Sequence, residues 1–150
     1  MRIAMFQPDI AQNAGTLMRL SACMGIGIDI IEPCGFLWND NKLKRAGMDY
    51  IQKVNYKRHT SWNAFKDYSV NNNHRLILLT TKAENSYTKF DFKENDILLL
   101  GQESCGVPQE VHNNVDSRVV IPMYGDFRSI NIATAGAMVL GEALRQIGKI

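Results

Sequence analysis

Two segments of this chain place polar side chains directly after apolar runs. Residues 98–108 read LLLGQESCGVP, and residues 121–133 read IPMYGDFRSINIA. In each segment the apolar run stops at Gly or Pro, small and polar residues follow, and a helical pattern then begins. An α/β sheet builds ligand sites in this way, at the carboxyl ends of its strands. We therefore expect these two loops to form the functional site.

A third candidate segment, residues 7–19, reads QPDIAQNAGTLMR. Asn13 can cap the helix expected over 14–24, which is a sufficient structural role. Arg19 lies off the apolar stripe of that helix. It is therefore either a solvated helix residue or a group that faces a ligand.

Several other chemistries are not expected. The only Gly-x-Gly, residues 25–27, follows a helical pattern rather than a strand, so it does not predict a dinucleotide site, and no phosphate-binding loop motif occurs. The three cysteines are odd in number and have no Cys-x-x-Cys spacing, which indicates reduced thiols. The three histidines are scattered, so we expect no metal.

Length and composition favour one globular domain over residues 1–150, with 45% apolar and 21% charged residues. No apolar run approaches the roughly 20 residues of a membrane-spanning helix, so we expect no membrane partner. The first expected strand begins almost at Met1, which leaves no room for a signal peptide. A cytoplasmic location is therefore expected.

Positive charge is concentrated between Lys42 and His59. This window holds six basic residues and one acidic residue, a net +5, whereas the other residues sum to −3. Tyr50 and Tyr56 lie among the basic residues, a pattern that suits a polyanion such as RNA. The alternative is a solvated basic face without a ligand.

Apolar runs alternate with helical patterns along the chain, which predicts an α/β fold with a parallel sheet. The unbroken runs at 76–79 and 97–100 indicate central strands that are covered on both faces. Expected strands span 2–6, 27–31, 52–56, 75–80, 96–101 and 118–121, and expected helices span 14–24, 40–46, 62–69, 109–114 and 131–147. Ser61 and Asp40 are expected caps, Pro108 suits a first helical turn, and Gly25 is an expected helix stop.

The last expected helix carries Gly136 and Gly141 among several alanines. A glycine inside a helix costs roughly 1 kcal/mol relative to alanine, so two of them suggest close approach of another backbone. That backbone belongs either to the sheet of the same chain or to a second subunit.

Taken together, the three segments resemble the motifs of the SpoU group of SPOUT RNA methyltransferases. The matching residues are Asn13-x-Gly15-x-x-x-Arg19, Gly101-x-Glu103-x-x-Gly106-x-Pro108, and Ile121-Pro122-Met123 with Ser129-Ile130-Asn131. Residues 30–36, 45–50 and 79–82 extend the resemblance to the short, single-domain methyltransferases that act on the 2′-hydroxyl of the tRNA wobble nucleotide, cytidine or a modified uridine.

The resemblance implies a SPOUT fold with a C-terminal trefoil knot, S-adenosylmethionine as cofactor, tRNA as substrate and a homodimer. Residues 133–134, Ala-Thr, replace the more usual Ser-Asn, and Cys105 stands where many relatives have Arg. The implied cofactor-binding residues are Leu79, Thr80, Gly101, Glu103, Ile121, Met123, Ser129, Ile130 and Asn131.

The resemblance also makes Arg19 the leading catalytic candidate, with Asn13, Glu103, Ser129 and Asn131 shaping the site. A guanidinium stays protonated at neutral pH, so we expect Arg19 to orient the ribose hydroxyl and the adjacent phosphate rather than to act as a base. A hydroxyl acceptor needs no covalent intermediate, so no nucleophilic role is expected of Cys105.

We expect the basic window to supply RNA contacts, through Lys42, Lys44, Arg45, Lys57 and Arg58. Two alternatives stay open. One is the same chemistry on another RNA, such as ribosomal RNA, and the other is an RNA-binding module without catalysis.

Overall fold

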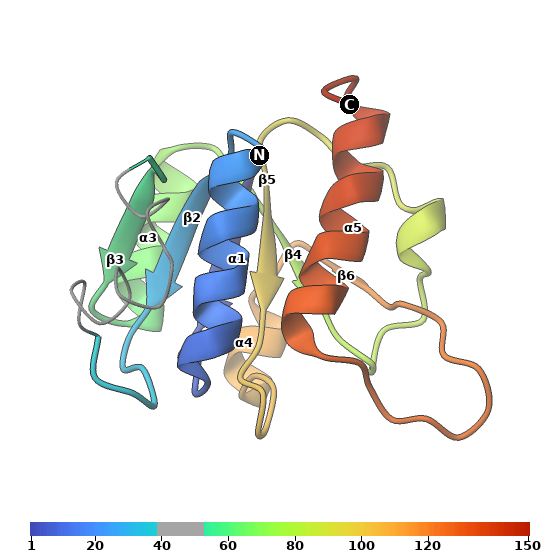
Figure 1. Cartoon of the computed structure of the whole chain (residues 1–150), viewed down its shortest axis with the longest axis horizontal. Coiled ribbons are helices and arrows are strands. Elements are labelled where there is room, and N and C mark those ends of the chain that lie inside the picture. Colours follow the sequence, from blue (N-terminus) through green and yellow to red (C-terminus); the bar gives the residue numbers. More distant parts are fainter. Residues whose placement is uncertain (39–52) are drawn as a thin grey trace.

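Six parallel strands form the centre of the molecule in a computed structural model that describes residues 1–38 and 53–150 (Figure 1). Their order across the sheet is β3-β2-β1-β5-β4-β6, and every neighbouring pair is parallel. The strands are β1 (Arg2–Phe6), β2 (Gly27–Ile31), β3 (Tyr56–His59), β4 (Arg75–Leu79), β5 (Asp96–Leu100) and β6 (Ser117–Val119). The predicted α/β parallel sheet is confirmed.

Helices cover both faces of the sheet. They are α1 (Ala11–Cys23), α3 (Trp62–Asn71), α4 (Gln109–Asn113) and α5 (Ile132–Gln146), with a short 3₁₀ turn, η2 (Tyr87–Lys89). Helices α1 and α5 pack side by side on one face, and α3 and α4 lie on the other (Figure 1). In β5, Leu98 and Leu100 join the core beneath α1 and α5, whereas Ile97 and Leu99 join the core beneath α3 and α4. Burial on both faces explains why this strand is an unbroken apolar run.

Two of the predicted helix ends are confirmed. The Ser61 hydroxyl accepts a hydrogen bond from the Ala64 N–H at 3.2 Å and caps α3. Gly25 adopts φ +63° after α1, and the Ile26 N–H then donates to the Ser21 carbonyl. A left-handed glycine of this kind ends a helix without the steric cost that a side chain adds.

One predicted cap differs from the structure. Helix α1 begins a turn earlier than expected, with Ile10 as its N-cap, so Asn13 lies inside the first turn and does not cap it. The Asn13 amide bonds to remote segments instead. Pro108 directly precedes α4, which begins at Gln109 as predicted.

The third strand was predicted at 52–56 but runs over Tyr56–His59, so that prediction was wrong. Its position follows from a buried contact that local patterning does not reveal. The His59 Nε2 lies 2.8 Å from Asp29 Oδ1, and Arg2 Nε donates to Asp29 Oδ2 at 2.6 Å. These contacts link β1, β2 and β3 on one face. The helix expected over 40–46, with its cap at Asp40, lies outside the described residues.

The two glycines of α5 have different surroundings. A Cβ on Gly136 would lie 2.9 Å from a methyl of Leu17 on α1 and 3.1 Å from one of Leu100, whereas a Cβ on Gly141 meets nothing within 4 Å. Gly136 therefore permits close packing within this chain, and Gly141 leaves an open surface. The trefoil knot stays a prediction of the resemblance. In the described part of the chain, no helix is both long and apolar enough to span a bilayer.

Candidate functional site

A cavity of about 610 Å³ opens at the carboxyl ends of β4 and β5, beside the starts of α1 and α5. This is where parallel α/β sheets place their ligands. All three predicted segments contribute to its lining, together with residues that follow β4. The predicted site residues that line it are Asn13, Leu79, Thr80, Gly101, Glu103, Ser129, Ile130 and Asn131.

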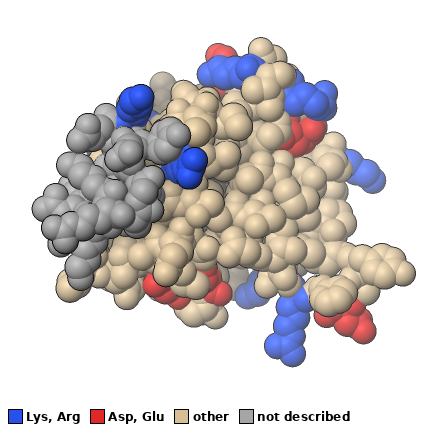
Figure 2. Space-filling model, in the orientation of Figure 1, with Lys and Arg blue, Asp and Glu red and all other residues tan. Residues whose placement is uncertain are grey.

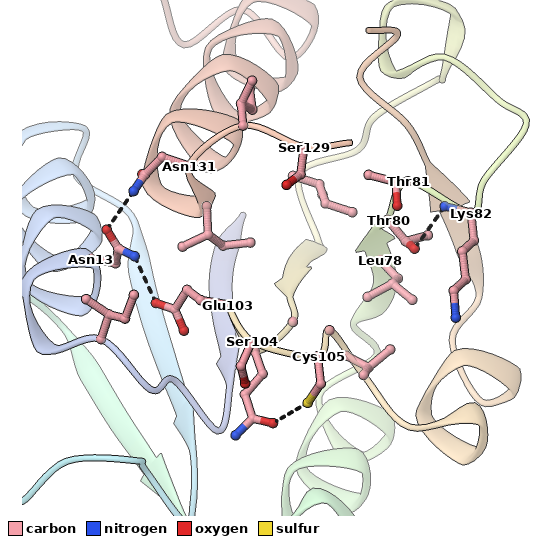
Figure 3. Close-up of a pocket in the computed structure, with 18 of the residues that line it drawn as sticks. Asn13, Leu78, Thr80, Thr81, Lys82, Glu103, Ser104, Cys105, Ser129 and Asn131 are labelled. Atoms are coloured by element: carbon pink, nitrogen blue, oxygen red, sulfur yellow. Dashed lines mark hydrogen bonds between the residues drawn. The ribbon is translucent and has the colours of Figure 1, made fainter. Parts of the chain in front are cut away.

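A series of hydrogen bonds links one side of this cavity (Figure 3). Asn131 Oδ1 caps α5 by accepting from the N–H groups of Ala133 and Thr134 at 2.9 and 3.2 Å. The Asn131 Nδ2 donates to Asn13 Oδ1 at 2.9 Å, and the Asn13 Nδ2 donates to Glu103 Oε1 at 3.0 Å. Three side chains that are remote in the sequence thus fix the starts of α1 and α5 and the loop after β5 relative to one another.

Asp9 continues this series of hydrogen bonds. Its backbone N–H donates to Glu103 Oε2 at 3.0 Å, and its Oδ2 accepts from the Ser104 N–H at 3.2 Å. Burial alone raises the pKa of Asp9, but hydrogen bonds with Ser104 and Glu103 outweigh it and hold this pKa below 3.8. Asp9 is therefore a carboxylate at neutral pH that ties residues 103–104 to the first loop.

The loop after β5 turns back on itself within six residues. Gln102 and Gly106 exchange two backbone hydrogen bonds of 2.8 Å, and Gly106 adopts φ +73°. A Cβ on Gly101 would lie 2.8 Å from the Gly106 carbonyl carbon, so glycine is required at Gly101. The Cys105 thiol lines the cavity and donates to the side-chain oxygen of Gln102 at 2.9 Å. This contact lies within the loop, between residues three positions apart.

The opposite side of the cavity is formed by residues that follow β4 and by α4. Figure 3 shows Thr80, Thr81 and Lys82 across the cavity from Asn13 and Asn131. The Thr80 hydroxyl accepts from the Lys82 N–H at 3.2 Å, which fixes this turn. Burial, with Arg118 and Lys82 nearby, lowers the pKa of His112 below 6.5. The cavity therefore has a carboxylate, Glu103, on one side and an ammonium group, Lys82, on the other.

The remaining predicted cofactor residues, Ile121 and Met123, line a smaller cavity of about 90 Å³. This cavity shares Leu79, Thr80, Ser129, Ile130 and other residues with the larger one, so the two are adjacent. The structure therefore brings all nine predicted cofactor residues to one region.

Arg19, the leading catalytic candidate, is exposed on α1 and lines neither cavity. It lies on the outer stripe of the helix, in register with the exposed Thr16 and Cys23. A single chain thus brings together Asn13, Glu103, Ser129 and Asn131 but leaves Arg19 outside.

The predicted RNA contacts can be located only in part, because Lys42, Lys44 and Arg45 lie outside the described residues. Lys57 and Arg58 lie on the edge strand β3, and both are exposed. The Lys57 Nζ lies 4.0 Å from the centre of the Tyr68 ring, and Arg58 forms an ion pair with Glu32. On the face drawn in Figure 2, most basic side chains of the described residues lie around the rim, and one lies further in, beside the grey atoms.

Sequence reasoning missed Asp9, Lys82 and His112. Asp9 was missed because its contacts with Glu103 and Ser104 join residues far apart in the chain. Lys82 and His112 were missed because only the fold brings them to the same cavity. No group of three His, Cys, Asp or Glu side chains in the described residues is arranged to hold a metal ion.

The cavity suits a cofactor such as S-adenosylmethionine in size and lining. Its volume falls within the usual range for small-molecule sites, about 300–1,000 Å³. Leu79, Ile130 and Ile132 supply apolar walls for an adenine ring. The Glu103 carboxylate could attract the positively charged part of this cofactor, and the Lys82 ammonium could attract its carboxylate.

A family model described as "SpoU rRNA Methylase family" matches residues 1–141 of this chain. A tRNA (cytidine(34)-2′-O)-methyltransferase of Beijerinckia indica subsp. indica is 53% identical over 99% of this chain and 92% of its own length. A solved structure described as "Structural insights into the 2-OH methylation of C/U34 on tRNA" is 39% identical and covers 97% of this chain and 94% of its own, with a TM-score of 0.89.

The SpoU methyltransferase AviRb of Streptomyces viridochromogenes, solved with AdoMet, is 23% identical and has a TM-score of 0.88. The match covers 97% of this chain and 60% of the AviRb chain, and at this identity it shows only that the two folds are alike. The motifs that meet at one cavity, the 53% identity over nearly the whole chain and the shared fold all indicate the same family. This chain belongs to the SpoU rRNA Methylase family.

Proposed function

We propose that this protein transfers the methyl group of S-adenosylmethionine to the ribose 2′-hydroxyl of the wobble nucleotide, position 34, of tRNA. The observation that carries the proposal is the hydrogen-bond series from Asn131 through Asn13 to Glu103, which joins the three motif segments around one cavity. The relative at 53% identity, which bears the name of this activity, supports the choice of tRNA and of position 34.

The bound cofactor would supply a methyl group on a sulfonium centre, which is already activated for transfer. The protein can therefore act mainly by positioning groups and by placing charge. Asn13 and Asn131 would fix the loops around the cofactor, and Glu103 would stabilise positive charge beside them. Ser129, exposed at the start of the α5 segment, would face the incoming ribose.

The chain would work as a homodimer of single-domain subunits in the cytoplasm. In support, the surface over α1 and α5 is largely free of charged side chains in Figure 2. Met138 is 41% exposed there, Met24 is 42% exposed, and Gly141 leaves open space beside them. Uncharged, partly apolar helix faces of this kind suit a self-complementary contact between two copies.

Pairing would also matter for Arg19. Because Arg19 lines neither cavity of its own chain, a catalytic role requires either a second copy or a movement of α1. Mixed dimers separate these cases. A dimer that joins an Arg19→Ala subunit to a cofactor-deficient subunit keeps one complete site only if Arg19 acts across the interface. A one-to-one mixture would then recover about a quarter of wild-type activity, whereas action within one chain gives none.

The second candidate is the same reaction on ribosomal RNA, because the family description names rRNA. Bulk tRNA, ribosomal RNA and methyl-labelled S-adenosylmethionine distinguish the two when the products are digested and mapped. We expect 2′-O-methylation at tRNA position 34, and a transcript with 2′-deoxyribose at that position should accept no label. Labelling of ribosomal RNA alone would favour the second candidate, and cofactor and RNA binding without transfer would favour a non-catalytic module.

A further inference from the structure

Two aromatic side chains stand out from the surface of the loop between β6 and α5. Tyr124 is 93% exposed and Phe127 is 76% exposed. Every other aromatic residue that the structure describes is buried or half-buried. Exposing a large ring to water is less favourable than burying it. Two such rings three positions apart therefore suggest a surface that binds a partner.

This loop leads directly into the site. Met123, next to Tyr124, lines the smaller cavity, and Ser129 to Asn131, which follow Phe127, line the larger one. Figure 1 shows the loop projecting from the molecule beyond the carboxyl ends of the strands, and Gly125 turns the chain at φ +62° between the two rings. The loop that carries the two rings is therefore anchored at both ends by residues that line the cavities.

Resting on the proposed function, we propose that Tyr124 and Phe127 form a stacking platform for unpaired nucleobases that flank the methylated nucleotide of the RNA. Every base has a π-face, and sequence-tolerant binding of single-stranded RNA commonly uses stacking on aromatic side chains. The exposed Arg128, adjacent to Phe127, adds a positive charge that suits the phosphates of the same strand.

RNA is favoured over a second copy of the chain for two reasons. The surface of α1 and α5, which is largely free of charged side chains, already offers a broad face for a copy, whereas the loop offers two separate rings among polar and charged residues. The loop is also joined at both ends to residues of the cavities, so whatever it binds lies beside the reaction.

The test compares the wild type with the double variant Tyr124→Ala/Phe127→Ala, by measuring binding of an anticodon stem-loop and of S-adenosylhomocysteine. We expect the Kd for the stem-loop to rise about tenfold for each ring removed, with the Kd for the small ligand unchanged. With 2-aminopurine beside nucleotide 34, the wild type should quench the fluorescence on binding, and the double variant should quench it less.

Matched variants separate stacking from other effects. Tyr124→Phe and Phe127→Tyr should retain wild-type affinity, whereas the double leucine variant should lose it, because leucine is apolar but offers no ring. Val70→Ala, a change at a residue of α3 that is 65% exposed, should alter nothing.

An unchanged Kd for the stem-loop in the double alanine variant would overturn the proposal, as would a loss of the dimer in sedimentation, which would place a second copy on the rings. Failure of the proposed function looks different. In that case the wild type itself neither binds the stem-loop nor methylates nucleotide 34.

Discussion

Asn13 donates one hydrogen bond and accepts another, and its two partners lie 90 and 118 residues away in the sequence. Asn131 also caps α5, and Glu103 also accepts from the Asp9 N–H, so Asn13 is the middle of a series that holds the cavity together. Truncation of Asn13 leaves the half-buried Glu103 carboxylate without this donor, and it also removes a partner of the exposed Asn131 amide. The cost of such losses is about 1–3 kcal/mol for each buried group.

We therefore predict that Asn13→Ala lowers the free energy of unfolding by about 1–3 kcal/mol and weakens S-adenosylhomocysteine binding at least tenfold. Urea denaturation and isothermal titration calorimetry measure the two effects. Thr16→Ala, one turn further along α1 and exposed, is the control. Equal behaviour of both variants would contradict a linking role for Asn13.

Asp9 gives a pH dependence with a defined sign. Its pKa in the folded chain is held below 3.8, so its contacts with Ser104 and Glu103 stabilise the fold above about pH 4. This contribution is lost as pH falls through the folded pKa. Asp9→Asn removes the charge but keeps the shape of the side chain. It should therefore flatten the acid side of the plot of unfolding free energy against pH. If the unfolding free energy of Asp9→Asn fell as steeply below pH 4 as that of the wild type, Asp9 would not stabilise the fold in this way.

At the scale of elements, the glycine-containing loop after β5 is the least tolerant part of the site. Gly101→Ala places a Cβ 2.8 Å from the backbone of Gly106, and backbone cannot move aside as a side-chain end can. We predict that this variant folds but loses most cofactor affinity, as measured by calorimetry and circular dichroism. Gly141→Ala, which meets nothing within 4 Å, should instead stabilise α5 by up to about 1 kcal/mol.

The elements themselves were largely predictable. Apolar runs located β4 and β5, and Ser61 and Gly25 marked helix ends, because these signals act between neighbouring residues. The start of α1 and the position of β3 were predicted wrongly. Both depend on contacts across the fold, Asn13 with Glu103 and His59 with Asp29, which no local pattern encodes.

The site divides in the same way. Motif residues that end strands or begin helices were predicted and do meet in one region, since parallel strands bring their carboxyl ends to one edge. Asp9, Lys82 and His112 were missed because their roles arise from neighbours that only the fold supplies.

For the whole molecule, the open face of α1 and α5 predicts how two copies meet. Gly141→Arg should convert the proposed dimer to monomers, because a long charged side chain would occupy the open space that glycine leaves on α5. Sedimentation velocity measures this directly. Lys149→Arg, at the exposed end of the chain, is a control with unchanged charge. A Gly141→Arg protein that still forms dimers would place the contact on another face.

The central claim is that three remote segments form one pocket for the methyl donor. A crystal structure with bound S-adenosylhomocysteine tests it most directly. We expect the ligand in the 610 Å³ cavity, between Thr80 and Lys82 on one side and Glu103 and Asn131 on the other. A ligand bound away from residues 101–107 and 129–132 would contradict the account.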